Sequence, residues 1–123
     1  MVNPQRSKGT AFETKVVRFL TGAGFAARRV VQHGSNDHGD IHIGDVPDVV
    51  IEAKNHRRFD FGGWLRQAER EAANADKKVG IVVAKRPGIA DPADSYVVMT
   101  LSALTHLLEG MRDESSHKEG EER

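Results

Sequence analysis

Two short apolar segments that carry acidic residues constrain the fold of this 123-residue chain more than any other feature. Residues 40–43 read Asp-Ile-His-Ile, and residues 49–54 read Val-Val-Ile-Glu-Ala-Lys. The loop between them, residues 44–48, contains a glycine and a proline, which suit a turn between antiparallel strands. Because side chains alternate between the two faces of a strand, one face of this hairpin is wholly apolar and the other is charged.

The expected register places Ile41 opposite Ile51, and therefore Asp40 opposite Glu52 on the charged face. Directly opposed residues have Cβ atoms about 4.5–5.5 Å apart. Two carboxylates at that distance repel each other unless a cation lies between them or one is protonated. Mg²⁺ is suitable because it binds carboxylate oxygens. Lys54 shares this face, so the hairpin predicts metal-assisted phosphodiester hydrolysis. The alternative is an ordinary amphipathic hairpin with a Glu–Lys pair on its wet face.

The composition narrows the class of protein. With 38% hydrophobic and 29% charged residues, the chain is expected to form one polar domain with a single modest core. It has no cysteine, which excludes disulfides and thiolate metal sites. No apolar run approaches the roughly 20 residues of a membrane span, and the amino terminus has no apolar signal core. We therefore expect a cytoplasmic protein without a membrane partner.

Charge is unevenly distributed along the chain, although the formal net charge is zero. Residues 1–30 carry six basic residues and one acidic residue, whereas residues 109–123 carry six acidic and three basic residues. A basic amino-terminal segment is compatible with a phosphate-backbone partner, and a solvated helix face is the alternative. Residues 111–123 have Met111 as their sole apolar anchor, so we expect a disordered acidic tail after a domain of residues 1–110.

Hydrophobic periodicity and turn residues predict the order of the elements. Residues 1–6 are expected to form a loose arm. The expected helices cover residues 7 or 10 to 22, 63–76 and 101–110, and the expected strands cover residues 25–32, 40–43, 49–54, 79–84 and 95–100. The four leucines of the last helix are expected to face the core. This order predicts an α/β fold in which a mixed sheet is flanked by helices.

An ordered set of polar residues on these elements resembles the PD-(D/E)xK nuclease superfamily. The set comprises Glu13 on the first helix, Gly39-Asp40-Ile41, Ile51-Glu52-Ala53-Lys54-Asn55, and Gln67 on the second helix. The segment from Arg6 to Glu13, with Gly24-Phe25, is similar to archaeal-type Holliday junction resolvases. Versions of these enzymes carried by bacteriophages are similar also through Trp64-Leu65 and Val83-Ala84-Lys85-Arg86. The resemblance covers residues 6–108.

The resemblance implies a restriction-endonuclease-like fold with an αβββαβ core. It implies a homodimeric endonuclease that acts on branched DNA and cuts two symmetry-related strands of a four-way junction. The implied cofactor is Mg²⁺, with Mn²⁺ able to substitute. The implied location is the cytoplasm, or the host cytoplasm for a bacteriophage protein.

The resemblance also implies a role for each matching residue. Asp40 and Glu52 would bind the metal, and Glu13 would complete the metal shell through water. Lys54 would act at the scissile phosphate, and Gln67 would support the site from the second helix. Without the resemblance, Gln67 is interpreted as an exposed helical residue.

Two of these assignments have alternatives in the sequence. The literal Pro-Asp, residues 47–48, lies about 13 Å from Glu52 along one strand. That distance is too long for a shared ion, so the aspartate role is assigned to Asp40. Thr10 and Glu13 also form a Thr-x-x-Glu capping box, in which the carboxylate would bind a free backbone N–H.

Other polar residues near the hairpin are weaker candidates. Asp37 is either a further metal ligand or a loop residue bonded to its own backbone. His33, His38 and His42 suggest a zinc site beside the acidic residues. No helical spacing brings these histidines together, so we favour solvated or DNA-facing positions for them.

Basic residues are expected to contact the nucleic acid. The expected contacts are Arg6, Lys8, Arg28, Arg29, Arg57, Arg58, Lys85 and Arg86. Arg57 and Arg58 precede two phenylalanines, Phe59 and Phe61, and this combination of charge and apolar wedges suits DNA backbone or an open junction centre. The alternative places these aromatic rings in the core, where Trp64 is also expected.

Three alternatives to this function are weighed. Another nuclease of the same fold, acting in repair, in restriction or on RNA, would use the same residues. A nucleic-acid-binding protein without chemistry is disfavoured, because it has no need for clustered acidic residues that face phosphate. A plain structural domain ranks last.

Overall fold

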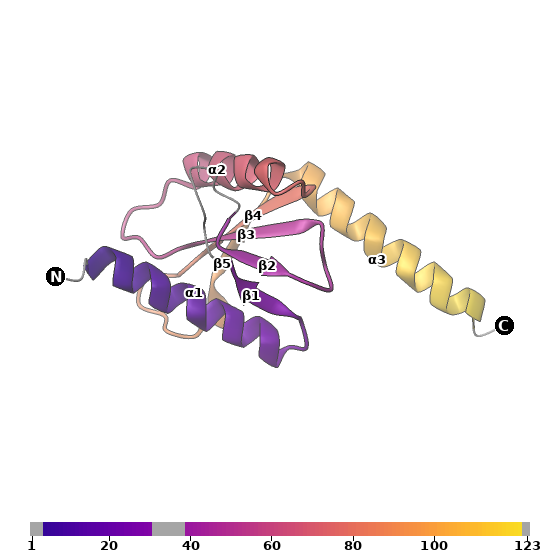
Figure 1. The fold of residues 1–123 in the computed structure, drawn as a ribbon, viewed down its shortest axis with the longest axis horizontal. Coiled ribbons are helices and arrows are strands. Elements are labelled where there is room, and N and C mark those ends of the chain that lie inside the picture. Colours follow the sequence, from indigo (N-terminus) through magenta and orange to yellow (C-terminus); the bar gives the residue numbers. More distant parts are fainter. Residues whose placement is uncertain (1–3, 31–38, 122–123) are drawn as a thin grey trace.

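The computed structural model describes residues 4–30 and 39–121 (Figure 1), with side chains described for residues 8–30 and 39–114. The helices are α1 (Pro4–Gly22), α2 (Phe61–Asn74) and α3 (Leu101–Glu121), with a short 3-10 helix, η1, at Pro92–Asp94. The strands are β1 (Ala27–Arg29), β2 (Ile41–Ile43), β3 (Val49–Lys54), β4 (Val79–Ala84) and β5 (Tyr96–Val98). This is the element order that the sequence predicts.

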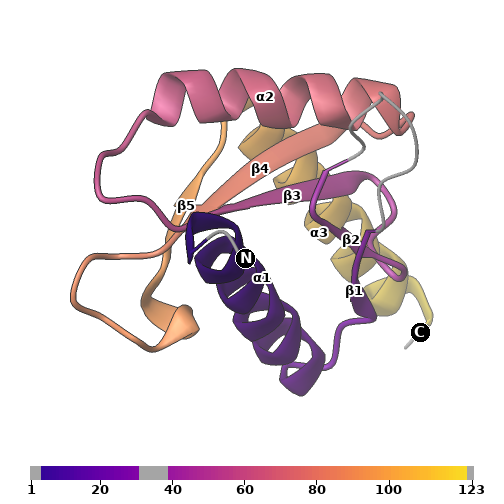
Figure 2. The same cartoon turned by 60° about the vertical axis from the view of Figure 1, so that its left-hand side comes forward.

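The described strands form one mixed sheet in the order β1-β2-β3-β4-β5. β3 and β4 are parallel, because α2 crosses over between them, and the other neighbours are antiparallel. Figure 2 shows α2 on one face of the sheet and α1 on the other. The expected α/β class is therefore confirmed, and the arrangement is consistent with a restriction-endonuclease-like core.

Each face of the sheet has its own core. On the α1 side, the larger core includes Phe12, Val16, Ile41, Ile51 and Ile81. On the α2 side, the smaller core contains Trp64, Ala68, Val82 and Ala84. Gly80 of β4 permits the close approach of α2, because a Cβ at this position would collide with the Ala68 backbone. Because Gly80 has no side chain, α2 can pack directly against β4 at this position.

The hairpin register predicted from the sequence is confirmed. Ile41 pairs with Ile51, and His42 pairs with Val50. The apolar face of the hairpin contributes to the larger core, as the alternation predicted. The charged face lies beneath α2 at the carboxyl end of β3, where Glu52 is only 4% exposed. Glu52 is therefore buried, whereas Asp40 and Lys54 of the same face are partly exposed.

Two helix boundaries differ from expectation by more than two residues, while α2 begins and ends two residues before its expected bounds. α1 begins at Pro4 because proline is tolerated in the first turn of a helix, where its missing N–H has no helical partner. α3 continues past Gly110 to Glu121, because one glycine costs a helix only about 1 kcal/mol and no proline follows. The backbone at residues 4–6 and 111–121 is thus helical in place of the expected arm and tail. Within the described residues, the first strand is limited to Ala27–Arg29.

The last helix exposes most of its leucines. Leu107 packs against the larger core, together with Ala103. Leu101, Leu104 and Leu108 are 78%, 39% and 52% exposed, so the expectation that all four leucines face the core is wrong. The reason is geometric, since α3 touches the sheet near its start and then extends beyond it (Figure 1). No helix among the described residues is long and apolar enough to cross a membrane.

Candidate active site

Four of the five predicted catalytic side chains line one hollow, which we call the acidic hollow. Glu13 of α1, Asp40 immediately before β2, and Glu52 and Lys54 of β3 surround a volume of about 310 Å³. The rest of the lining comes from Lys8, Gly9, Ala53, Asn55, His56 and Arg57. The acidic hollow lies at the carboxyl end of β3, a central strand of the sheet. The fold thus brings together residues that are far apart in the sequence.

Backbone hydrogen bonds fix Asp40 against β3. The Asp40 N–H donates to the Ile51 carbonyl at 3.1 Å, and the Ala53 N–H donates to Asp40 Oδ2 at 2.9 Å. The preceding residue, Gly39, has a φ of +92°, and a Cβ there would collide with the Val50 side chain. Glycine is therefore needed at this turn, which holds the Asp40 carboxylate beside the neighbouring strand.

A hydrogen-bonded network joins Lys54 to two buried glutamates through Gln67 of α2. Lys54 Nζ donates to Gln67 Oε1 at 2.9 Å and lies 3.4 Å from Glu52 Oε1. Gln67 Nε2 donates to Glu71 Oε1 at 2.9 Å and to Glu52 Oε1 at 3.4 Å. Both ends of the amide are therefore used, one for the ammonium group and the other for the carboxylates. Gln67 supports the site from behind rather than lining the acidic hollow.

Glu71 is a site residue that the sequence analysis did not identify. It is 1% exposed and lies one helical turn after Gln67 on the buried side of α2. Its carboxyl group is among the causes that raise the pKa of Glu52. The available signal was its spacing of four from Gln67, because residues four apart lie on the same face of a helix.

Burial and neighbouring carboxylates favour the protonated form of Glu52. Desolvation, a hydrogen bond shared with Glu71, and the charges of Asp40 and Glu71 raise its pKa from 4.5 to about 11, although Lys54 acts in the opposite direction. No described residue donates a hydrogen bond to the buried Glu52 Oε2. This oxygen therefore requires either a proton or a cation.

An ion pair holds Glu13 at the acidic hollow. Arg29 Nη2 lies 3.1 Å from Glu13 Oε2, and Arg29 Nε donates to the same oxygen at 3.1 Å. Burial and then the charge of Asp40 raise the pKa of Glu13, whereas Arg29 lowers it. Thr10 lies inside α1, and its carbonyl accepts a hydrogen bond from the Thr14 hydroxyl. The capping-box interpretation is therefore wrong, because capping requires a helix start at Thr10.

The donor set of the acidic hollow fits a hard divalent cation. Within residues 4–30 and 39–121, no three His, Asp or Glu side chains stand close enough together to hold a metal ion. The chemistry nevertheless suits Mg²⁺ or Mn²⁺, because Glu13, Asp40 and Glu52 offer only carboxylate oxygens. A cation bound there would replace the proton that burial and the neighbouring carboxylates favour on Glu52.

The other candidate ligands are placed elsewhere or fall outside the described residues. Those outside are His33, Asp37 and His38. His42 lies within the ladder between β1 and β3, and it does not line the acidic hollow. Asp48 Oδ2 lies 3.1 Å from His106 Nε2 of α3. The literal Pro-Asp therefore contacts the last helix, which agrees with the choice of Asp40 for the acidic hollow.

Basic side chains extend from the acidic hollow across one side of the molecule. Lys8 and Arg57 line the hollow, and together with Lys85 they also line a shallow depression beside it. The two depressions also share Asn55 and His56. A polyanion that enters the acidic hollow can therefore continue along a surface with positive charge.

The other basic residues predicted to contact nucleic acid, where their side chains are described, do not line either depression. Arg28 and Arg58 are exposed, and Arg29 forms the ion pair with Glu13. Arg86 lies over the ring of Tyr96, with Cζ 5.2 Å from the ring centroid. The side chain of Arg6 lies outside the described residues.

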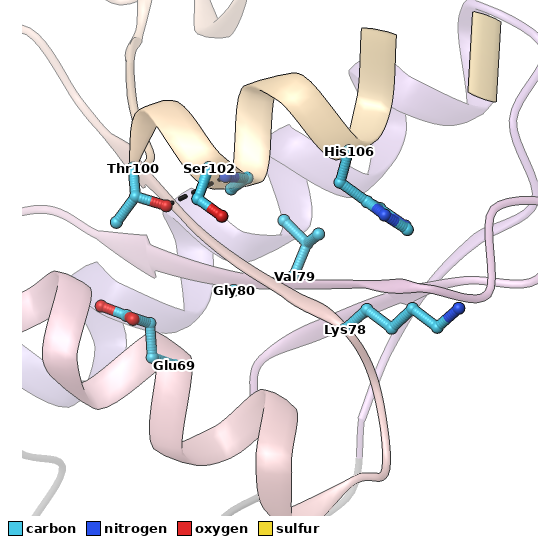
Figure 3. A pocket seen from close by; sticks show the side chains of 8 residues that line it. Glu69, Lys78, Val79, Gly80, Thr100, Ser102 and His106 are labelled. Atoms are coloured by element: carbon cyan, nitrogen blue, oxygen red, sulfur yellow. Dashed lines mark hydrogen bonds between the residues drawn. The ribbon is translucent and has the colours of Figure 1, made fainter. Parts of the chain in front are cut away.

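A second hollow of about 390 Å³ lies near the start of β4 (Figure 3). Glu69 of α2, Lys78, and Thr100 and His106 at α3 contribute to its lining. Thr100 caps α3, because its Oγ1 accepts a hydrogen bond from the Ala103 N–H at 3.0 Å. None of the described charged side chains around this hollow is buried. It therefore lacks the clustered, desolvated carboxylates that distinguish the acidic hollow.

The fold and the acidic hollow together define an α/β protein in which carboxylates and a lysine meet at the carboxyl end of a central strand. No protein-family model matches the chain, and neither a curated protein nor a solved structure matches it.

Proposed function

We propose that this protein is a divalent-metal-dependent endonuclease of the PD-(D/E)xK type, with four-way DNA junctions as its substrate. One observation carries the proposal. Three carboxylates and the Lys54 ammonium share one hollow, where burial and mutual repulsion keep Glu52 protonated unless a cation replaces the proton. A structural hairpin gains nothing from such an arrangement, because the buried carboxylates destabilise the fold.

The carboxylates and the lysine of the acidic hollow have different roles in this proposal. Asp40 and Glu52 would hold the cation directly, and Glu13 would complete its shell through water. When bound, the cation would supply Lewis-acid polarisation of the phosphate and would acidify a water molecule. Lys54, oriented by Gln67 at 2.9 Å, donates hydrogen bonds to the phosphate oxygens as negative charge develops on them. Because Glu52 must lose its proton to become a ligand, metal binding is expected to release protons.

The proposal includes a homodimer, because one copy has one acidic hollow and a four-way junction requires two symmetric cuts. α3 supports this with an exposed apolar stripe formed by Leu101, Leu104, Leu108 and Met111. The stripe has the alternating spacing of three and four that pairs helices in coiled coils. Since α3 extends beyond the sheet (Figure 1), the stripe is accessible to a second copy.

Leu108→Asp is expected to convert the homodimer to a monomer, because a carboxylate in the centre of a paired stripe is desolvated without a partner. The measurement is molar mass by light scattering during size-exclusion chromatography. Ser102→Asp adds the same charge to an exposed position outside the stripe, and it should remain dimeric. A monomeric wild-type protein, or an L108D variant that stays dimeric, would exclude the stripe as the contact.

The nuclease proposal is tested by incubating the purified protein with a synthetic immobile four-way junction and Mg²⁺. Linear duplex, flap, single-stranded DNA and RNA are tested in parallel, and reactions with EDTA reveal contaminants. Paired symmetric nicks in the junction alone are the expected result. Metal-dependent cutting of other substrates would keep the nuclease but remove the junction selectivity. Tight DNA binding without cutting would favour a binding protein instead.

A further inference from the structure

A cluster of aromatic rings lies beside the acidic hollow, and we call it the ring cluster. Phe59 stacks on Phe61 with centroids 4.9 Å apart, and it makes an edge contact with Tyr96 at 5.9 Å. Trp64 anchors the ring cluster from α2, with its centroid 6.0 Å from that of Phe59 and 5.3 Å from that of His56. Rings from the loop before α2 and from β5 therefore converge on one place.

The ring cluster is not closed off from solvent. Trp64 is buried, but Phe59 is 37% exposed and Tyr96 is 41% exposed. These two rings meet edge to face with planes at 89°, so the cluster presents aromatic surface in two orientations. Core packing alone does not account for rings that remain this exposed in contact with each other. Trp64 therefore lies in the core as expected, whereas the alternative that places the loop aromatics in the core does not hold for Phe59.

Three arginines lie beside the ring cluster. Arg57 and Arg58 immediately precede Phe59 and are exposed. Arg86 lies over the Tyr96 ring at 5.2 Å, which is a cation–π contact. Asp60 is the one acidic residue within residues 57–61. It caps α2, because its Oδ1 accepts a hydrogen bond from the Gly63 N–H. The rings are thus bordered by cations that can bind phosphate.

The ring cluster is continuous with the acidic hollow. His56 is in ring contact with Trp64, and it also lines both the hollow and the depression beside it. Burial and the ammonium groups of Lys54 and Lys8 lower the pKa of His56, so its ring is neutral at physiological pH. Ring contacts from His56 to Trp64 and from Trp64 to Phe59 therefore connect the edge of the hollow with the exposed part of the ring cluster.

From this juxtaposition we propose that the ring cluster is a stacking platform for unpaired nucleobases, next to the site of phosphodiester hydrolysis. The inference rests on the proposed nuclease function and deepens it by naming the feature of the substrate that is read. Every nucleobase has a π face that stacks on an aromatic ring, and flanking cations bind the backbone. A base inside a continuous duplex is already stacked on its neighbours, so the platform selects DNA that is locally unpaired.

The test measures binding without hydrolysis, in EDTA, by fluorescence anisotropy of two labelled probes. The first probe is a duplex interrupted by a short single-stranded thymidine gap. The second is the same duplex with abasic residues in the gap, which keeps every phosphate and removes every base. Wild-type protein is expected to bind the base-bearing probe at least about fivefold more tightly, which is the lower limit for one stacked base.

Phe59→Leu and Tyr96→Leu each remove a ring and keep an apolar side chain. Both variants are expected to lose the preference for the base-bearing probe, with unchanged affinity for the abasic probe. The matched control is Phe25→Leu, because Phe25 is 42% exposed but lies between α1 and β1, outside the ring cluster. It should keep the wild-type preference. Circular dichroism and thermal melting establish that each variant is folded.

Trp64 provides a second measurement that needs no substitution. Its emission in the wild-type protein is expected to change when the base-bearing probe binds and to stay constant with the abasic probe. Equal wild-type affinity for the two probes, or an undiminished preference in F59L and Y96L, would overturn the platform and leave the nuclease proposal intact. A change in molar mass of these variants with an unchanged preference would also overturn it, in favour of a contact with a second copy. If the wild-type protein does not cleave any substrate in the junction assay, the nuclease proposal itself is refuted.

Discussion

Glu52→Gln is expected to abolish metal-dependent cleavage and to make the protein more stable at neutral pH. Cleavage should fall about 10³-fold or more, because a lost metal ligand removes several kcal/mol of transition-state stabilisation. Stability should rise because glutamine removes a buried group that is unfavourable when ionised. Glu52 is 4% exposed, and its pKa is raised to about 11 by burial and by Glu71 and Asp40. The gain is about 1–3 kcal/mol, because keeping at pH 7 a proton that the unfolded carboxyl group loses above pH 4.5 costs at most about 3 kcal/mol.

The pH dependence of stability separates this explanation from a general effect of the substitution. The pKa of Glu52 is higher in the folded state than the unfolded value of 4.5, so the folded protein retains a proton that the unfolded chain loses. Its contribution to stability is therefore fully present below about pH 4.5 and is lost as the pH rises towards 11. Without metal, the free energy of unfolding of the wild-type protein should fall more steeply with pH than that of E52Q.

The effect of Mg²⁺ on thermal stability provides a second test of the role of Glu52. Mg²⁺ is expected to raise the melting temperature of the wild-type protein at neutral pH, since only the folded state holds the ligands together. The same addition should leave E52Q almost unchanged. Glu69→Gln makes an identical change at an exposed position of α2 and serves as the control for both measurements. A lower melting temperature for E52Q, or cleavage at the wild-type rate, would contradict the assignment of Glu52.

The central hairpin was predictable because local rules agree on it. Alternation of period two fixed which side chains share a face, and a loop with glycine and proline fixed the register, so Ile41 pairs with Ile51 as expected. Asp40, Glu52 and Lys54 then meet as a direct consequence of that register. The helix ends were less predictable, because Pro4 and Gly110 are compatible with helix at small cost and no local rule decided between the possibilities.

The site residues that were harder to predict from the sequence are those whose position depends on packing between distant elements. Glu13 reaches the acidic hollow because α1 packs on β3, and only the family resemblance indicated this. Glu71 was missed because an acidic residue on an amphipathic helix is normally assigned to solvent, whereas here Gln67 and Glu52 surround it. The contact between Phe59 and Tyr96 is likewise set by the pairing of β4 with β5 and has no local signature.

Lys54→Met is expected to reduce kcat about 10²- to 10³-fold while leaving KM for the DNA nearly unchanged. Methionine keeps the length and the apolar contacts of the lysine stem, so it removes little except the ammonium group. The loss has the size observed when one preorganised donor to a developing oxyanion is removed. KM should be maintained because Lys8 and Arg57 still line the acidic hollow and Lys85 still lines the depression beside it.

The control for K54M must distinguish loss of the hydrogen-bond donor at the reacting phosphate from loss of one positive charge on the protein. Lys78→Met removes the same charge at an exposed position beside the second hollow, near the start of β4, and should leave kcat unchanged (Figure 3). Gln67→Leu leaves Lys54 in place and removes the amide that orients it, so it should lower kcat by less than K54M does. If K54M instead keeps the wild-type kcat, the ammonium group acts only as a counter-ion for Glu52, and phosphate activation must come from other groups of the acidic hollow.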